Sequence, residues 1–351
     1  MFQQILHSFN LPGDGWHIQP FGSGLINHTW KVSGAGAEAY ILQRINTGVF
    51  KNPGHIAANL LLVQNYLEQH TPGYLFVAPI PAKNGEGLVI HDGHYYRLTP
   101  FIQNSHTVNV LTDSHQACEA AKQFGQFTRL LNGFNAAQLQ YTIPDFHNLT
   151  LRVAQFEKAL ASADPIRLRK AAETIKEAQS HTAIAETFSQ LAQNKQMPLR
   201  VIHHDTKINN VLFDATGKGL CVIDLDTVMP GFYSSDVGDM MRTYLSPASE
   251  EEQDFSKITV REEYFSALHR GYMQQMGEVL SPFEKSLFVY SGKFIIYMQA
   301  LRFLSDYLNN DTYYGAKYEG HNLMRAQNQL MLLAKYIACE DKFEQIVRDF
   351  K

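Results

Sequence analysis

The sequence predicts an α+β fold of two lobes, an N-terminal antiparallel β-sheet lobe with one helix and a larger, mostly helical C-terminal lobe. Short β-prone runs separated by glycine turns dominate the first 102 residues. Apolar residues recur at helical spacing over most of the chain beyond Ser114, with one β-hairpin in their midst. We therefore expect the lobes to span residues 1–102 and 103–351.

The composition narrows the class of protein. Its 351 residues, 45% apolar and 18% charged, suit a globular protein with a large buried core. A net charge of −4 argues against non-specific binding of nucleic acid, and the three cysteines lack metal or redox spacing. No segment has the apolar length of a membrane span, and the first residues lack the pattern of a signal peptide. We expect a cytoplasmic protein that binds neither nucleic acid nor membrane.

Residues 19–32 predict two strands joined by a glycine turn, Gly22-Ser23-Gly24. Gly22 and Gly24 allow backbone N–H groups to approach an anion closely. A dinucleotide-binding turn would continue into a helix, whereas residues 29–32 are typical of a returning strand. The turn therefore favours a β-hairpin that covers phosphates, with an ordinary hairpin turn as the alternative.

Residues 39–46 predict another strand, in which Gln43 and Arg44 point to opposite faces. We expect Arg44, the only cation of this strand, to face the interior. A helix should then begin at Pro53 and end near residue 70, with apolar residues at helical spacing. Residues 78–90 and 95–102 predict further strands, with turns at residues 84–87 and 91–93, and the last strand serves as the connector to the helical lobe.

Beyond Ser114 we expect a helix that ends near Gly133, and helices over residues 150–196 that are interrupted at residues 163–165. Asp236 is suited to cap a later helix, in which Asp239 and Arg242 are spaced to form an ion pair. Residues 293–307 predict an apolar helix whose few charges should be paired or face a ligand.

The hairpin predicted over residues 211–223 places three polar side chains at one of its ends. His204-Asp205 and Asn210 come just before its first strand, and Asp224-Leu225-Asp226 follows its second. Phosphoryl transfer uses such a set, in which one Asp orients and deprotonates the attacking hydroxyl while an Asn and a second Asp hold Mg²⁺. Asp and Asn also favour turns and caps, but the combined spacing favours catalysis.

With these motifs, the chain resembles the aminoglycoside phosphotransferase and choline kinase-like superfamily over roughly residues 20–335. It is most similar to the N-acetylhexosamine 1-kinases, and the segments that carry this similarity are residues 40–46, 204–213, 223–231 and 302–308. The resemblance implies a bilobal protein-kinase-like fold. It also implies ATP and Mg²⁺ as cofactors.

The resemblance further assigns roles to individual residues. Asp205 would be the catalytic base, and Asn210 and Asp224 would hold Mg²⁺. Gly22 and Gly24 would cover the nucleotide phosphates. The usual third-strand lysine and the glutamate that partners it on the first helix are both missing; Arg44, or else Gln43, takes the place of the lysine, and Glu68 is the only acid of that helix.

The function expected from this resemblance is transfer of the ATP γ-phosphoryl group to the anomeric hydroxyl of a small-molecule substrate, an N-acetylhexosamine. Candidate substrate-binding residues are Tyr233, Arg302, Asp306 and the Asn27-His28 pair. One alternative is a kinase of the same fold that acts on an amino-alcohol or an aminoglycoside, which calls for an acidic or aromatic pocket. A nucleotide-binding pseudokinase is the other, supported only by the missing lysine.

Overall fold

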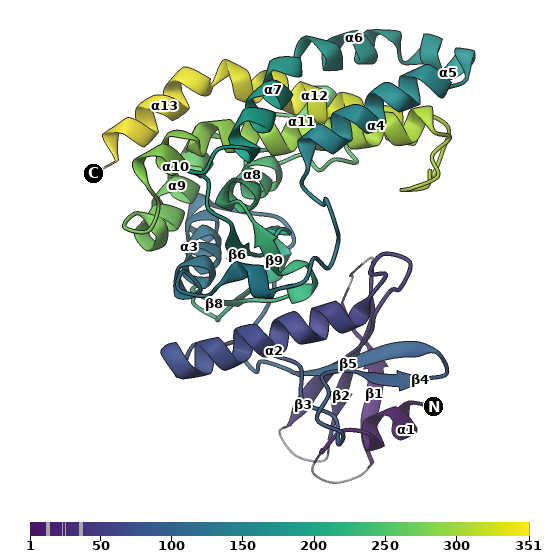
Figure 1. Cartoon of the computed structure of the whole chain (residues 1–351), viewed down its shortest axis with the longest axis vertical. Helices are drawn as coiled ribbons and strands as arrows, with labels where there is room; N and C mark the ends of the chain where they lie inside the picture. Colours follow the sequence, from purple (N-terminus) through teal and green to yellow (C-terminus); the bar gives the residue numbers. More distant parts are fainter. Residues whose placement is uncertain (12–14, 23, 25, 35–37, 351) are drawn as a thin grey trace.

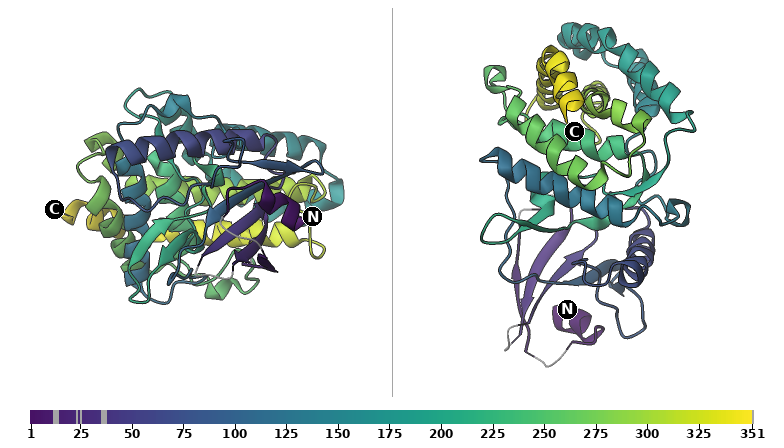
Figure 2. Two further views of the ribbon diagram at one scale, coloured as in Figure 1. Left: turned by 90° about the horizontal axis from the view of Figure 1, so that it is seen from below. Right: turned by 90° about the vertical axis from the view of Figure 1, so that its left-hand side faces the viewer.

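The computed structural model describes residues 1–11, 15–22, 24, 26–34 and 38–350. It has the predicted α+β architecture. An antiparallel sheet lies at one end of the molecule and the helical lobe lies at the other (Figure 1). The right-hand view of Figure 2 shows the same separation, with helix α2 beside the sheet and toward the helical lobe.

The sheet has five strands in the order β1-β2-β3-β5-β4, each antiparallel to its neighbour. Its strands are β1 (His17–Pro20), β2 (His28–Ser33), β3 (Ala39–Arg44), β4 (Val89–His91) and β5 (His94–Pro100). Helix α1 (Phe2–His7) packs on the sheet, so that Ile5, Leu6 and Phe9 join Val32, Leu42 and Leu98 in one core. This core gives the sheet a buried face of its own.

The prediction of a strand over residues 78–90 is wrong for most of that range. The first strand residue there is Val89; before it, Ala82 forms an isolated bridge with Phe9, and the N–H of Ile80 donates to the carbonyl of Leu98 in β5 at 2.7 Å. Pro79 and Pro81 explain the difference, because a proline has no N–H to donate to a neighbouring strand.

Helix α2 (Pro53–His70) begins and ends where the sequence predicts. Its apolar face packs into the core of the helical lobe rather than into the core of the sheet. The side chain of Asn59, which is 1% exposed, adds hydrogen bonds to two backbone carbonyls of the helical lobe, at 2.8 Å from Gln140 and 2.9 Å from Val228. The helix therefore lies between the two parts of the molecule and contacts both.

The helical lobe is built around the apolar helix α11 (Phe288–Leu308), which packs against α4 (Leu149–Ser162), α8 (Tyr233–Tyr244) and α12 (His321–Ala338). Helices α3 (Ser114–Leu130) and α9 (Glu262–Met276) pack so closely that a Cβ at Gly271 would lie 2.1 Å from the carbonyl oxygen of Cys118. The remaining helices are α5 (Pro165–Lys170), α6 (Ala172–Ser180), α7 (Thr182–Ala192), α10 (Pro282–Ser286), α13 (Glu340–Asp349) and the 3₁₀ turns η1 (Ala136–Gln138), η2 (Ile208–Asn210), η3 (Leu225–Thr227) and η4 (Phe255–Lys257).

The predicted hairpin is confirmed as β7 (Val211–Phe213) and β8 (Gly219–Val222), which pair antiparallel. A second short ladder joins β6 (Arg200–Ile202) to β9 (Met229–Gly231) on either side of it. Both ladders lie on the side of the helical lobe that faces α2 and the sheet (Figure 1). Within the part of the chain that the structure describes, no helix combines the length and apolarity that a bilayer crossing demands.

Candidate active site

The loop between β6 and β7 is fixed by two carboxylates of helix α8. Asp236 accepts the backbone N–H groups of His203 and His204, at 2.9 and 2.7 Å, and Asp239 accepts that of Thr206 at 2.9 Å. His204 has a positive φ of 65°, a conformation that these hydrogen bonds help to hold. Burial lowers the pKa of His204 to about 3, so its imidazole is neutral at physiological pH.

The role expected for Asp236 as a helix cap is therefore wrong. Helix α8 begins at Tyr233, so Asp236 lies inside its first turn and directs its carboxylate toward the loop. The expected ion pair between Asp239 and Arg242 is present at 2.9 Å. Burial raises the pKa of Asp236 to about 6.

Asp205 lies on this loop with its side chain 22% exposed. One carboxylate oxygen is 3.0 Å from the Nζ of Lys207. Burial works to raise the pKa of Asp205, but Lys207 and His203 outweigh it and hold the pKa below its usual value. Asp205 is thus an ionised acceptor at neutral pH, which a proton-accepting group needs to be.

Asn210 and Asp224 are brought together at the end of the hairpin, as predicted. The Nδ2 of Asn210 donates to the backbone carbonyl of Asp205 at 2.9 Å, which leaves its amide oxygen as a free acceptor. Asp224 has a positive φ of 58°. Like Asn210, it lines a cavity between the sheet and the hairpin, and its carboxylate has no hydrogen bond to any described residue. Burial and the nearby carboxylates of Asp226 and Asp205 raise the pKa of Asp224 to about 7.

These two side chains fit a magnesium ion that is bound together with a nucleotide. Among the described residues, no group of three or more His, Cys, Asp or Glu side chains is arranged to hold a metal by itself. Mg²⁺ needs no such group, because it is commonly held by one or two carboxylates plus water and substrate phosphates. A carboxylate and an amide oxygen that face a shared cavity are the oxygen ligands it prefers.

A cavity of about 530 Å³ lies between the sheet and the hairpin. Gly22, with φ of +78°, and Gly24 line it from the β1–β2 turn, while Ser23 lies outside the described residues. Asn210 and Asp224 line it from the hairpin side. Thr99, Pro100, Phe101 and Ile102 of the predicted connector form another wall. The cavity thus joins an apolar wall to the polar end of the hairpin, an arrangement that suits a base and its phosphates.

The structure does not place Arg44 in this cavity, contrary to expectation. Gln43 lines it instead, because β3 is paired with β5 in a register that sets Gln43 opposite Arg97. Arg97 also lines the cavity and is the only lysine or arginine among its described lining residues. Its Nε and Nη2 donate to the Oε1 of Gln43 at 2.9 and 2.8 Å. Sequence reasoning missed Arg97, although it is the one cation of the strand assigned as a connector.

Asp226 joins this cation to the hairpin. Its Oδ1 accepts a hydrogen bond from Arg97 in an ion pair whose side chains are 4% and 3% exposed. Its other oxygen accepts from the Nδ2 of Asn27 at 2.7 Å, and the Oδ1 of Asn27 accepts the N–H of Asn46 at 3.0 Å. Asn27, a candidate for the sugar site, is therefore engaged between the lobes.

The candidates for the substrate side are placed differently from one another. Tyr233 is fully buried, donates its hydroxyl to the carbonyl of Glu284, and does not line the cavity that Asn210 and Asp224 face. Asp306 accepts the N–H groups of Tyr313 and Tyr314 at 2.7 and 2.9 Å, and also the Nδ2 of Asn322. Its carboxylate thereby shapes the loop after α11.

Arg302 forms no ion pair with a carboxylate among the residues that the structure describes. It donates to Gln299 at 3.1 Å and lies 5.4 Å from the ring centres of Phe146 and Tyr314. The ring of Phe146 is in turn 6.4 Å from that of His204, next to Asp205 in the chain. Arg302 and its aromatic neighbours therefore lie on the helical-lobe side of the catalytic loop.

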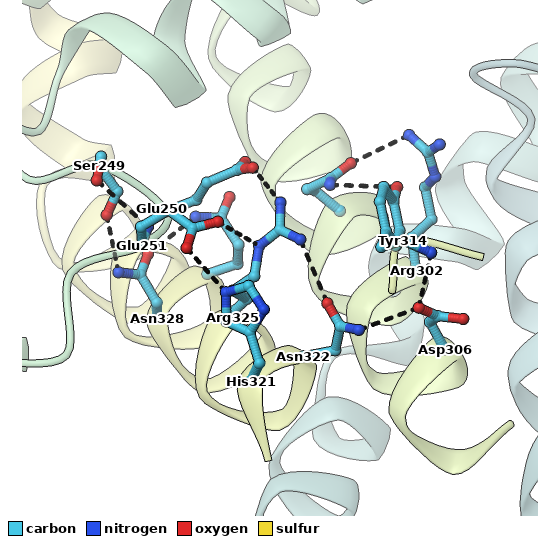
Figure 3. A network of polar contacts seen from close by, with 12 residues as sticks. Ser249, Glu250, Glu251, Arg302, Asp306, Tyr314, His321, Asn322, Arg325 and Asn328 are labelled. Atoms are coloured by element: carbon cyan, nitrogen blue, oxygen red, sulfur yellow. Dashed lines mark hydrogen bonds and ion pairs between the residues drawn. The ribbon is translucent and has the colours of Figure 1, made fainter. Parts of the chain in front are cut away.

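A network of hydrogen bonds and ion pairs extends from Asp306 along helix α12 (Figure 3). Arg325 pairs with Glu250 and donates to Asn322, which donates to Asp306. Glu250 also pairs with Arg242 at 3.0 Å. Burial works to raise the pKa of Glu250, but Arg242 and Arg325 outweigh it and keep the pKa below its usual value. The acids of this network are matched by arginines or by N–H donors.

The comparisons with known proteins agree with this geometry. In fold, the chain is similar to an aminoglycoside phosphotransferase from Alicyclobacillus acidocaldarius subsp. acidocaldarius, with 14% identity, a TM-score of 0.64 and coverage of 99% of this chain and 96% of that one. It is also similar to a spectinomycin phosphotransferase in complex with ADP and spectinomycin (14%, 0.61, 98% of both chains) and to a microcompartment-associated aminopropanol kinase (16%, 0.61, 99% and 97%).

At such identities, these structures establish the fold alone, and the sequence itself supplies the assignment. The model of the phosphotransferase enzyme family, APH, matches residues 17–276, which is more than half of the chain. The match confirms the superfamily resemblance that the catalytic motifs indicate. The chain belongs to the phosphotransferase enzyme family.

Proposed function

We propose that this phosphotransferase transfers the γ-phosphoryl group of ATP to the anomeric hydroxyl of an N-acetylhexosamine. The observation that carries the proposal is a cation on the acceptor side of Asp205, Arg302, which donates to Gln299 and not to a carboxylate of the described residues. Within the described residues Arg302 has no carboxylate partner, whereas Arg242 pairs with Asp239 and Glu250, and Arg325 pairs with Glu250 and Glu251. A cationic aminoglycoside or amino-alcohol would meet like charge, which costs free energy, whereas an uncharged sugar would not.

The aromatic side chains around Arg302 support the same proposal. Tyr313, Tyr314 and Phe146 all lie within 6.0 Å of its guanidinium, measured from the ring centres to Cζ. Apolar walls combined with a few polar groups are what a sugar ring and its acetamide need. The extended similarity of residues 302–308 to N-acetylhexosamine 1-kinases adds to this support.

The proposed chemistry assigns a task to each residue of the catalytic loop. Asp205 accepts the hydrogen bond of the attacking hydroxyl and takes its proton as the bond to phosphorus forms. Lys207, 3.0 Å from Asp205, keeps that carboxylate ionised and oriented. Asn210 and Asp224 hold Mg²⁺, and MgATP, when bound, supplies the phosphoryl group. Gly22 and Gly24 face the phosphates from the sheet.

We also propose that residues 1–102 form the nucleotide-binding lobe and residues 103–351 the acceptor lobe. The lining of the 530 Å³ cavity supports this division, because it draws the glycine turn and Gln43 from one part of the chain and Asn210 and Asp224 from the other. Ile102 lines the cavity at the proposed boundary, as a connector next to a bound base would.

An ADP-release assay tests the function. The acceptors are N-acetylglucosamine, N-acetylgalactosamine, glucose, galactose, choline and kanamycin. We expect turnover on an N-acetylhexosamine and a loss of about 10²- to 10⁴-fold in kcat for Asp205→Asn, the range typical of a general base. Asp92→Asn is the matched control, since Asp92 is 77% exposed in a distant turn.

The position of the phosphate, determined by ³¹P and ¹H NMR of the product, tests the anomeric assignment. Turnover on choline or kanamycin alone would replace the sugar by a cationic acceptor. Binding of ATP without turnover on any acceptor would favour a regulatory module instead.

A further inference from the structure

A second cavity, of about 380 Å³, lies between helices α4 and α11 and the loop that follows α11. It shares no lining residue with the 530 Å³ cavity proposed to bind the nucleotide, called the nucleotide cavity from here on. Asp205 is not among the residues that line the second cavity. Its lining combines cations, hydroxyls and aromatic rings, of which those the argument uses are Arg152, Lys158, Arg302, Ser305, Asp306 and Tyr313.

The charges that line this cavity are predominantly positive. In the described ranges of the chain, Arg152, Lys158 and Arg302 form no ion pair with a carboxylate; Arg152 and Arg302 donate instead to Gln155 and Gln299. Asp306 is the one carboxylate of the lining, and both of its oxygens already accept N–H groups. Three cations therefore line one cavity whose described lining contains a single carboxylate.

The wall of the cavity also has unused hydrogen-bonding capacity. The Nε of Arg152 and the Oγ of Ser305 are buried, and neither has a hydrogen-bond partner in the described part of the protein. A buried donor without a partner has lost its hydrogen bonds to water, so native proteins rarely retain two such atoms in one place. A ligand with several acceptor oxygens would satisfy both atoms after a small rotation of the side chains.

We propose that this cavity binds a small anion, the phosphate or carboxylate group of a metabolite, at a site separate from the nucleotide. Arginine guanidinium groups suit this ligand because their planar N–H pairs match the oxygens of phosphate and carboxylate. Lys158 at the exposed edge adds a flexible cation. Arg302 and Tyr313 also belong to the acceptor wall of the proposed function, so the inference rests on that proposal in part, and its tests use Arg152 and Lys158, which that wall does not include.

The anion site is connected to the catalytic loop through Arg152. The Nη2 of Arg152 donates to the carbonyls of Asp145 and Phe146, at 2.8 and 3.1 Å. The neighbouring His147 stacks on Phe146 and lies 5.4 Å, between ring centres, from His204. A bound anion would thus be held by the same side chain that fixes the segment packed against the catalytic loop.

Isothermal titration of inorganic phosphate into the full-length protein tests the site. The protein is first saturated with ADP and Mg²⁺, so that the nucleotide cavity cannot take up phosphate. We expect one site of millimolar affinity that weakens at least about tenfold in Arg152→Gln, which loses a positive charge and the unpartnered Nε–H donor. Lys158→Gln should weaken it by about two- to fivefold through charge alone.

Arg169→Gln is the matched control, because Arg169 is an exposed arginine outside the cavity and should leave phosphate affinity unchanged. Lys158 makes no side-chain contact that the fold requires, so its variant remains informative if Arg152→Gln misfolds. A hexose phosphate that binds tighter than inorganic phosphate, with the same loss in both variants, would identify a phosphorylated metabolite as the ligand. Absence of binding, or binding that both variants leave unchanged, would overturn the proposal.

Discussion

At the scale of single residues, a buried ion pair links the two lobes beside the nucleotide cavity. Arg97 of β5 and Asp226 after the hairpin are 4% and 3% exposed. Removing two charges from water is costly, and such a pair is tolerated only when further hydrogen bonds satisfy the remaining donors and acceptors. Gln43 and Asn27 supply these bonds, which makes the group a rigid unit beside Asp224.

We predict that Arg97→Met lowers the free energy of unfolding by about 3–5 kcal/mol, because it leaves the Asp226 carboxylate buried without its cation. Urea unfolding measures the loss. Adding Asp226→Asn should recover part of it, since no buried charge then remains. Lys170→Met is the control: its pair with Glu319 is largely exposed, and such pairs contribute little to stability. Equal losses in the two single variants would contradict the prediction.

Asp236 makes stability depend on pH in a definite direction. Burial raises its pKa from 3.8 to about 6, so the folded state binds this proton more tightly than the unfolded chain does. Its contribution to stability is therefore fully present below about pH 4 and is lost as the pH rises through about 6. A difference of about two pKa units corresponds to about 3 kcal/mol.

Asp236→Asn should remove this dependence. Relative to the wild type, the free energy of unfolding of the variant should rise by up to about 3 kcal/mol between pH 4 and pH 6. Guanidinium unfolding at several pH values in this range gives the difference directly, and the titrations of all other groups largely cancel in it. A difference that is constant with pH, or that falls, would show that Asp236 does not carry a raised pKa.

Sequence patterns could predict the positions of some of the site residues but not of others. Asp205, Asn210 and Asp224 were predictable because one short hairpin brings them together. Gln43 and Arg44 were not separable, because alternation shows that neighbours face opposite sides without showing which side is inward. In β3 the burial of successive residues is nearly uniform, so even the apolar pattern gives no phase.

At the scale of elements, helix α2 couples the sheet to the helical lobe. Asn59, buried in mid-helix, donates to the carbonyls of Gln140 and Val228 and accepts the N–H of Gln140 at 2.8 Å. In this fold a glutamate was expected on the helix to partner a strand cation. The structure instead pairs Arg97 of β5 with Asp226, and helix α2 binds the helical lobe through Asn59.

Asn59→Ala should destabilise the protein by about 2–5 kcal/mol, because it leaves two buried carbonyls and one N–H of the helical lobe with fewer partners. Asn65→Ala on the exposed face of the same helix is the control, and it should be neutral or slightly stabilising because alanine is the better helix former. Thermal unfolding monitored by circular dichroism compares the two. A similar effect of both substitutions would mean that the helix docks through its apolar face alone.

The elements themselves were predictable where the local signal was complete. Helix α2 has a proline start and regular apolar spacing, and the hairpin has a turn between two β-prone runs. Residues 78–88 failed because two prolines outweigh the apolar composition. The start of α8 failed because an aspartate that resembles a cap instead binds the backbone of a loop 32 and 33 positions away.

At the scale of the whole molecule, the sheet and the helical lobe have separate cores and meet around the nucleotide cavity. The contacts that fix this arrangement join residues far apart in the chain, such as Asn27 and Asp226, which are 199 positions apart. No local pattern contains such a pairing. The sequence could therefore predict two lobes and a catalytic hairpin, but not the way in which the lobes are joined.

A ligand that fills this cavity should stabilise both lobes together. A non-hydrolysable ATP analogue with Mg²⁺, at a hundred times its Kd, should add about 2.7 kcal/mol to the free energy of unfolding. Trp16 and Trp30, the only tryptophans, lie in the sheet lobe, whereas circular dichroism reports mainly the helices of the other lobe. Both signals should shift to higher urea by the same amount, because the cavity wall comes from both lobes.

Removing the metal should reduce this gain if Asp224 and Asn210 bind Mg²⁺ together with the nucleotide. At the same nucleotide concentration, EDTA should lower the stabilisation of the wild type, since a weaker Kd reduces the binding contribution. In Asp224→Asn, the gain should be equally small with and without Mg²⁺, and asparagine tolerates the positive φ of 58° that this position requires. Asp92→Asn, also at a positive φ but in an exposed turn, should behave as the wild type. Equal stabilisation of the wild type with Mg²⁺ and with EDTA would show that the nucleotide binds without a metal at this hairpin.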